Sequence, residues 1–129
     1  MFVLPPGPAV YVDVDTTLIE WDDPKNPEDC GVVWIHGKMF YVNEYNVAYL
    51  KKFADRNHAI IVWSGSGVAW AQAVVRALGL TDYVHAVLSK PSYYIDDIKD
   101  PKVWIGKHRF YTLEGIAIHA RDFIGEDGK

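Results

Sequence analysis

Acidic, hydroxyl and basic side chains follow the apolar segments of this chain in a pattern that suits phosphate chemistry. Apolar runs occur at residues 9–14, 58–63, 84–88 and 93–95, and each run ends in, or is soon followed by, a group that can bind or react. In chain order these groups are Asp13 and Asp15, then Ser64, then Lys90, then Asp96 with Asp97.

Carboxylates that meet at one edge of a sheet repel one another unless a cation neutralises them. Oxygen ligands of this kind suit Mg²⁺, which takes one or two carboxylates together with water and substrate phosphate. A carboxylate can also attack phosphorus and form an aspartyl phosphate. The acidic residues therefore predict a magnesium site with a carboxylate nucleophile.

The turn Ser64-Gly65-Ser66-Gly67 precedes a predicted helix. Backbone N–H groups and the helix dipole favour an anion at such a position, so we expect Ser64 and Gly65 to bind phosphate. Lys90 offers a compact positive charge that would offset the charge of the phosphate and of the carboxylates.

These residues need a scaffold that brings the ends of the strands together. The apolar runs read as buried strands. One helix is predicted from the cap residue Asn43 to about residue 57, and a second after Ser64 to Leu78, where Gly79 ends it. Strands that alternate with helices predict an α/β fold with a central parallel sheet, where polar groups after the strands share one crevice. Residues 31–42 are expected to form a β-hairpin flap.

The segment Asp13-Val14-Asp15-Thr16-Thr17-Leu18 resembles the DxDx(T/V)(L/V) signature of the haloacid dehalogenase (HAD) superfamily. Ser64, Lys90 and the pair Asp96-Asp97 resemble the remaining motifs of this family, in the family's order. The resemblance covers residues 9–97 and implies a Rossmann-like three-layer sandwich with Mg²⁺ as cofactor.

The resemblance also implies a role for each residue. Asp13 would attack phosphorus and bind Mg²⁺, and Asp15 would act as the acid and base while its carbonyl binds the metal. Ser64 and Lys90 would hold the transferring phosphoryl group. Asp97 would be the third metal ligand, with Asp96 supporting it from the outer shell.

Some positions depart from the family's pattern. Thr16 stands where glycine is common, and Lys90 precedes Asp97 by a short interval, so Lys99 or Lys38 are alternatives to it. The residues between Asp15 and the first predicted helix are enough for a flap but too few for a large cap domain. We therefore expect an open, capless site that takes bulky substrates or is completed by a partner subunit in a homo-oligomer.

Bulk properties narrow the function further. At 129 residues the chain is expected to form one domain, residues 1–129, and a net charge of −4 argues against a surface that binds nucleic acid by net charge alone. Cys30 is the only cysteine, which fits a reducing cytoplasm. No apolar run approaches membrane-spanning length, so we expect a soluble protein without a membrane partner.

The expected function is a phosphomonoesterase acting on a nucleotide or a nucleic-acid end, with small metabolites and phosphoproteins as rival substrates. Aromatic residues of the flap and of the segment before Asp96 are candidates for base stacking, although packing is their default role. Residues 99–111 mix basic and aromatic side chains, which is consistent with a nucleic-acid surface or a solvated loop. A receiver-like phosphoacceptor and a non-catalytic phosphate-binding domain are the alternatives.

Overall fold

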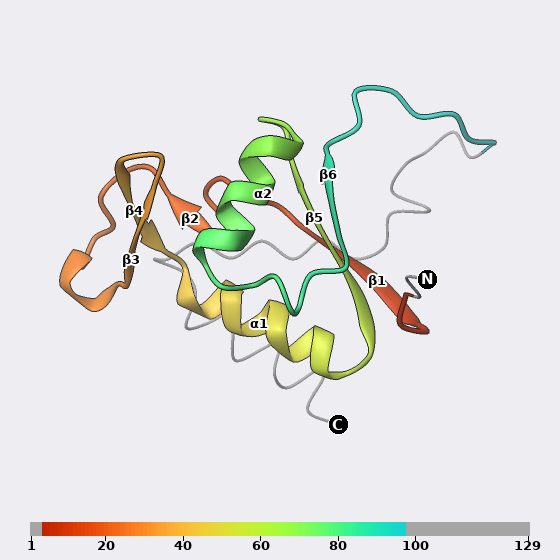
Figure 1. Ribbon diagram of the computed structural model, residues 1–129, viewed down its shortest axis with the longest axis horizontal. Coiled ribbons are helices and arrows are strands. Elements are labelled where there is room, and N and C mark those ends of the chain that lie inside the picture. The colour runs from red at the N-terminus through yellow and green to blue at the C-terminus, as the bar shows by residue number, and fades with distance from the viewer. Residues whose placement is uncertain (1–3, 98–129) are drawn as a thin grey trace.

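The computed structural model describes residues 4–97, which form a small α/β protein (Figure 1). A parallel sheet has the strand order β1-β5-β6, and two helices connect its strands. The elements are β1 (Gly7–Val12), α1 (Glu44–Asp55), β5 (His58–Ser64), α2 (Val68–Ala77) and β6 (Ala86–Ser89). The predicted α/β class with a parallel sheet is therefore confirmed.

Both helices pack on the same face of the sheet. Ile60 and Val62, two residues apart in β5, share one hydrophobic cluster with Leu50 of α1 and Val74 of α2. Residues two apart in a strand point to one face, so this face carries both helices. Two successive right-handed crossovers that each move to the next strand in the same direction place their helices on the same face of the sheet. Within the described residues the arrangement has two layers, and the third layer of the expected sandwich stays a prediction.

Residues 31–42, predicted as the flap, belong to a second, antiparallel sheet with the order β2-β4-β3, and this whole sheet is called the flap below. Its strands are β2 (Ile19–Glu20), β3 (Val32–Ile35) and β4 (Lys38–Val42), and a single 3-10 turn, η1 (Pro27–Asp29), precedes β3. Positive φ angles at His36 (51°) and Gly37 (78°) suit a two-residue hairpin turn. The hairpin predicted at 31–42 is confirmed, while the two-residue β2 was too short to predict.

The predicted helix boundaries are confirmed at two caps. The Asn43 side chain accepts a hydrogen bond of 3.1 Å from the backbone N–H of Asn46, which caps α1. At the end of α2, Gly79 has φ of 68° and Leu80 N donates to Val75 O at 2.9 Å. This is a Schellman motif, in which glycine accepts the left-handed conformation without strain.

The chain after β6 differs from the prediction. The third strand was expected at 84–88 and lies at Ala86–Ser89. A fourth strand expected at 93–95 is wrong, because these residues form no strand and Tyr93 and Ile95 are fully or almost fully exposed. Figure 1 shows this segment leaving the sheet, and within residues 4–97 no strand pairs with it. Three apolar residues after Pro91 do not make a strand without such a partner.

Several predictions lie outside the described residues. They are the strand at 103–105, the helical or irregular segment 113–124, the basic and aromatic segment 99–111, and the alternative lysine Lys99. Among the helices of the described part, none is long and apolar enough to cross a membrane.

Candidate functional site

The turn after β1 presents two aspartates on a buried base. Val14 and Leu18 are completely buried, and Leu18 N donates to Val14 O at 2.8 Å to close the turn. Asp13 and Asp15, on either side of Val14, are only partly buried. The apolar residues thus anchor the turn in the core and leave both carboxylates at its surface.

Asp13 is held by one cation and one hydroxyl. Lys90 Nζ lies 3.0 Å from Asp13 Oδ1, and Thr17 Oγ1 donates to Asp13 Oδ2 at 3.2 Å. The side chains of Asp13 and Lys90 remain 33% and 41% exposed, so the pair is open to a ligand. The structure therefore brings together two predicted site residues that are far apart in the sequence.

The backbone of Ser64 explains how Lys90 reaches Asp13. The register of the parallel sheet pairs Ser64 with Ser89, and Lys90 N then donates to Ser64 O at 3.0 Å. The same carbonyl accepts from Gly67 N at 3.2 Å in the turn that opens α2. One carbonyl thus fixes both the predicted phosphate-binding turn and the start of the segment that carries Lys90.

The predicted phosphate-binding residues lie side by side in the turn that precedes α2. Ser64 is fully buried, and its Oγ accepts a 2.9 Å hydrogen bond from Ser66 N. A hydroxyl that accepts a bond keeps its own proton to donate. Gly65 is exposed, and a Cβ at this position would meet nothing within 4 Å. The turn is therefore open beside Gly65, whereas the Ser64 side chain is buried.

Asp15 accepts three hydrogen bonds that the sequence did not reveal. Trp21 Nε1 and Trp70 Nε1 lie 2.8 Å and 3.0 Å from Asp15 Oδ1, and Ser66 Oγ lies 3.3 Å from Asp15 Oδ2. Ser66 and Trp70 both follow Ser64 closely, in the turn and in the first turn of α2. The sequence signal for these contacts was the presence of tryptophan itself, because the N–H of a partly buried indole needs a hydrogen-bond acceptor.

Aromatic rings join the flap to α2, and two of them contact Asp15. Trp21 makes an edge contact with Phe40, with ring centroids 4.8 Å apart, and the Trp70 ring lies 5.8 Å from Trp21 and 5.6 Å from Phe40. The Lys38 ammonium lies 5.3 Å from the centre of the Trp21 ring, within the range of a cation–π contact. Lys38 is thus engaged with the flap aromatics, and Lys90 contacts Asp13.

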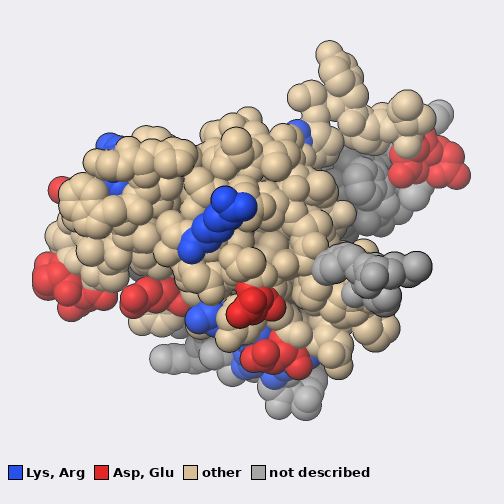
Figure 2. Space-filling model, in the orientation of Figure 1, with Lys and Arg blue, Asp and Glu red and all other residues tan. Residues whose placement is uncertain are grey.

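The candidate stacking residues divide into packed and exposed ones. Phe40 is 2% exposed and belongs to the core, in agreement with packing as the default role of these rings. Trp34 in β3 is 66% exposed, and Tyr93 beyond β6 is 91% exposed. Charged side chains on the face drawn in Figure 2 occur in small separate groups, so the described part of this face has no broad basic surface.

The acidic pair Asp96 and Asp97 is not brought to Asp13 and Asp15. Both residues are exposed in the segment that runs away from the sheet (Figure 1). In residues 4–97 no group of three or more His, Cys, Asp or Glu side chains is arranged to hold a metal ion. The structure thus brings Lys90 to the turn that holds Asp13 and Asp15, and it places Asp97, the predicted third metal ligand, away from that turn.

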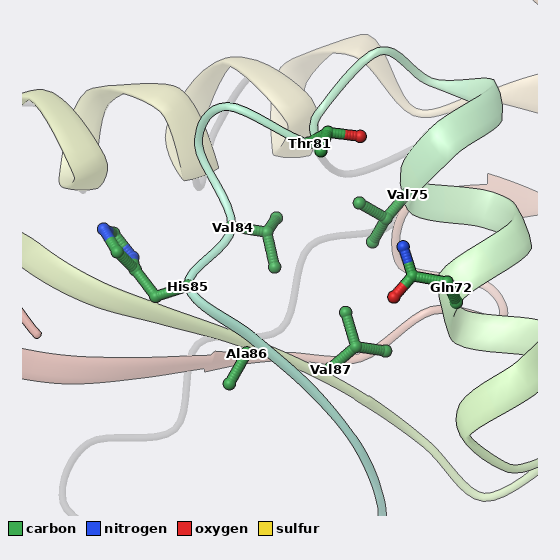
Figure 3. Close-up of a pocket in the computed structure, with 7 residues that line it drawn as sticks. All are labelled: Gln72, Val75, Thr81, Val84, His85, Ala86 and Val87. Atoms are coloured by element: carbon green, nitrogen blue, oxygen red, sulfur yellow. The ribbon is translucent and has the colours of Figure 1, made fainter. Parts of the chain in front are cut away.

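A hollow between α2 and β6 lies apart from these residues (Figure 3). Val75, Val84 and Val87 point toward one another across it, and none of its lining residues is a predicted site residue. His85 points away from the hollow, and its Nδ1 accepts a 2.9 Å hydrogen bond from Ile60 N. This histidine thus contacts the backbone of β5.

Comparison of the chain with family models, with curated proteins and with solved structures found no match. The residues at the strand ends and their geometry are therefore the basis on which a function can be proposed.

Proposed function

We propose that the protein is a Mg²⁺-dependent phosphomonoesterase that works through an aspartyl phosphate on Asp13. The observation that carries this proposal is the contact of Asp13 with Lys90 Nζ at 3.0 Å, beside Asp15 at the end of the same strand. A nucleophile, a positive charge and a second carboxylate are the groups that phosphoryl transfer through an enzyme carboxylate requires. The resemblance to the HAD signature supports the same chemistry.

The reaction has two steps. In the first, an Asp13 oxygen attacks phosphorus, the bond from phosphorus to the ester oxygen breaks, and Asp15 gives its proton to the departing oxygen. In the second, Asp15 takes a proton from water, the water oxygen attacks the same phosphorus, and the bond to Asp13 breaks to release inorganic phosphate. Asp15 thus begins and ends the cycle protonated.

Lys90 and the turn after β5 would bind the transferring phosphoryl group. The Lys90 ammonium already faces a carboxylate oxygen of Asp13, the atom type that the phosphoryl group will join. The open space beside Gly65 and the backbone N–H groups at the start of α2 supply room and donors for phosphate oxygens. The buried Ser64 hydroxyl would donate a hydrogen bond to the phosphoryl group.

Two oxygen donors at the strand end fit part of a Mg²⁺ site. They are the carboxylate of Asp13 and the backbone carbonyl of Asp15, and Mg²⁺ takes few protein ligands beside water and phosphate. When bound, the cation would neutralise charge on the phosphate. Asp97 is proposed as the third ligand and Asp96 as its support, which requires the segment after Lys90 to approach β1.

The substrate is proposed to be a nucleotide or a nucleic-acid end. The exposed rings of Trp34 and Tyr93 support this choice, because exposed aromatic rings can stack on bases. A second subunit that completes the open site, and a cytoplasmic location consistent with Cys30 as sole cysteine, belong to the same proposal.

The direct test measures phosphate release from p-nitrophenyl phosphate by the purified full chain, with Mg²⁺ and with a chelator. The wild-type protein should be active only with Mg²⁺, and Asp13→Asn should be inactive. Asp23→Asn, which alters an exposed aspartate of the loop before β3, is the matched control and should keep full activity. Full activity of Asp13→Asn would reject the mechanism. A screen of nucleotides, phosphorylated oligonucleotides, sugar phosphates and phosphopeptides then identifies the substrate class.

A further inference from the structure

One oxygen of Asp15 is occupied by two tryptophans. Trp21 Nε1 and Trp70 Nε1 approach the same atom, Asp15 Oδ1, at 2.8 Å and 3.0 Å. An indole N–H can donate a hydrogen bond and cannot accept one. A proton on Oδ1 would therefore face two donors, which makes this oxygen unsuitable for carrying a transferable proton.

The other oxygen of Asp15 has a partner that adapts to both charge states. Ser66 Oγ lies 3.3 Å from Asp15 Oδ2. A hydroxyl group can donate to an ionised carboxylate and can rotate to accept from a protonated one. Ser66 thus tolerates a proton on Oδ2, whereas Trp21 and Trp70 tolerate none on Oδ1.

The two tryptophans are themselves fixed by their surroundings. Trp70 lies on α2, and Trp21 directly follows β2 of the flap, where it packs edge-on against the buried ring of Phe40. Their rings are also 5.8 Å apart, so each limits the movement of the other. Side chains that pack in this way hold a polar partner in a narrow range of orientations.

We infer that Trp21 and Trp70 are positioning residues that direct the proton of Asp15 to Oδ2, the oxygen that would face the leaving group. This inference rests on the proposed phosphomonoesterase activity, because it assigns a role within the step in which Asp15 protonates the ester oxygen. It also connects the flap to the proposed catalysis, since Trp21 directly follows β2 of the flap and contacts Asp15.

The inference predicts a loss that depends on the leaving group. An alkoxide must be protonated as it departs, whereas dinitrophenolate departs without a proton. The parameter to compare is kcat/KM, because it reports the steps up to the departure of the leaving group and excludes later hydrolysis of the phospho-enzyme. A residue with a merely structural role would lower kcat/KM for both esters alike.

The experiment compares wild-type protein with Trp21→Phe and Trp70→Phe, which remove the N–H donors and keep aromatic rings. For an alkyl phosphate, kcat/KM should fall about tenfold or more in each variant, and for dinitrophenyl phosphate less than about threefold. Tyr45→Phe is the control, because Tyr45 is 53% exposed on α1 and has no role in the proposed site, and it should change neither value. Circular dichroism establishes that each variant is folded.

The outcomes separate the two proposals. If wild-type protein hydrolyses both esters and Trp21→Phe loses activity equally toward both, or loses none, the positioning role is wrong and the phosphatase stands. If wild-type protein hydrolyses neither ester, the proposed function fails and the inference fails with it. Trp21 is 48% exposed, so the Trp21 variant decides the question even where Trp70→Phe does not fold.

Discussion

Lys90 and Asp13 form an ion pair of 3.0 Å that links the end of the last described strand to the end of the first. Both side chains are partly exposed, and exposed ion pairs contribute about 0–1 kcal/mol to stability. Loss of the pair should therefore cost the fold little, so substitutions can test its proposed role in chemistry separately from folding.

Replacing Lys90 should separate activity from stability. Lys90→Met should lower kcat by about a hundredfold or more, because a positive charge at the phosphoryl group is lost. The free energy of unfolding should change by less than about 1 kcal/mol. Urea titration and phosphate release measure the two quantities. Lys25→Met, which changes an exposed lysine of the loop before β3, should alter neither. Retained activity in Lys90→Met would remove Lys90 from the site.

Asp15→Asn should slow the hydrolysis of the phospho-enzyme as well as its formation. An amide cannot take a proton from water, so the aspartyl phosphate should accumulate when a dinitrophenyl ester supplies the phosphoryl group without acid assistance. Acid quenching followed by mass spectrometry should find the phosphoryl group on the peptide that contains Asp13. A label on Ser64 or on a histidine would exclude Asp13 as the nucleophile. Asp82→Asn, at an exposed aspartate after α2, is the control.

The proposed metal site assigns a direct contact to Asp97 and an outer-shell role to Asp96. Asp97→Asn should raise the Mg²⁺ concentration needed for half-maximal activity by more than about tenfold, because it weakens a direct ligand. Asp96→Asn should raise it by a smaller factor, as expected for an outer-shell residue. A Mg²⁺ titration of activity compares the two variants. Equal values for wild-type protein and Asp97→Asn would show that another group completes the site.

Thr16 adopts a backbone conformation that suits glycine better. Its φ is 61°, and a β-branched residue in the left-handed region costs about 1–2 kcal/mol. Thr16 Oγ1 also donates to Asp15 O at 2.6 Å, which recovers part of this cost. Thr16→Gly should therefore raise the free energy of unfolding by about 1 kcal/mol, as measured by urea titration. A decrease would mean that the side-chain hydrogen bond outweighs the strain.

Local patterns in the sequence predicted most of the described fold. Asn43 and Gly79 marked helix ends because caps depend on the chemistry of a few adjacent residues. The hairpin turn and the apolar run of β5 are equally local. The strand wrongly predicted at 93–95 shows where local patterns are not sufficient. A strand needs a neighbour to pair with, and a short apolar run does not state whether one is present.

The candidate site was predictable in part for the same reason. Asp13 and Lys90 stand directly after strands and Ser64 ends one, and parallel strands bring such positions to one edge. The donors to Asp15 were missed, because Trp21 and Trp70 reach it from the flap and from a helix. Such a contact depends on how two separate elements pack, and no short pattern in the sequence records it.

The shared carbonyl of Ser64 makes the number of residues in β6 more important than their identity. Lys90 N binds this carbonyl directly after the paired residues Ser64 and Ser89. Successive residues of a strand face opposite sides of a sheet, so the loss of one residue from β6 would turn the ammonium away from Asp13. Variation among related chains should therefore replace the side chains of this strand freely and conserve its length.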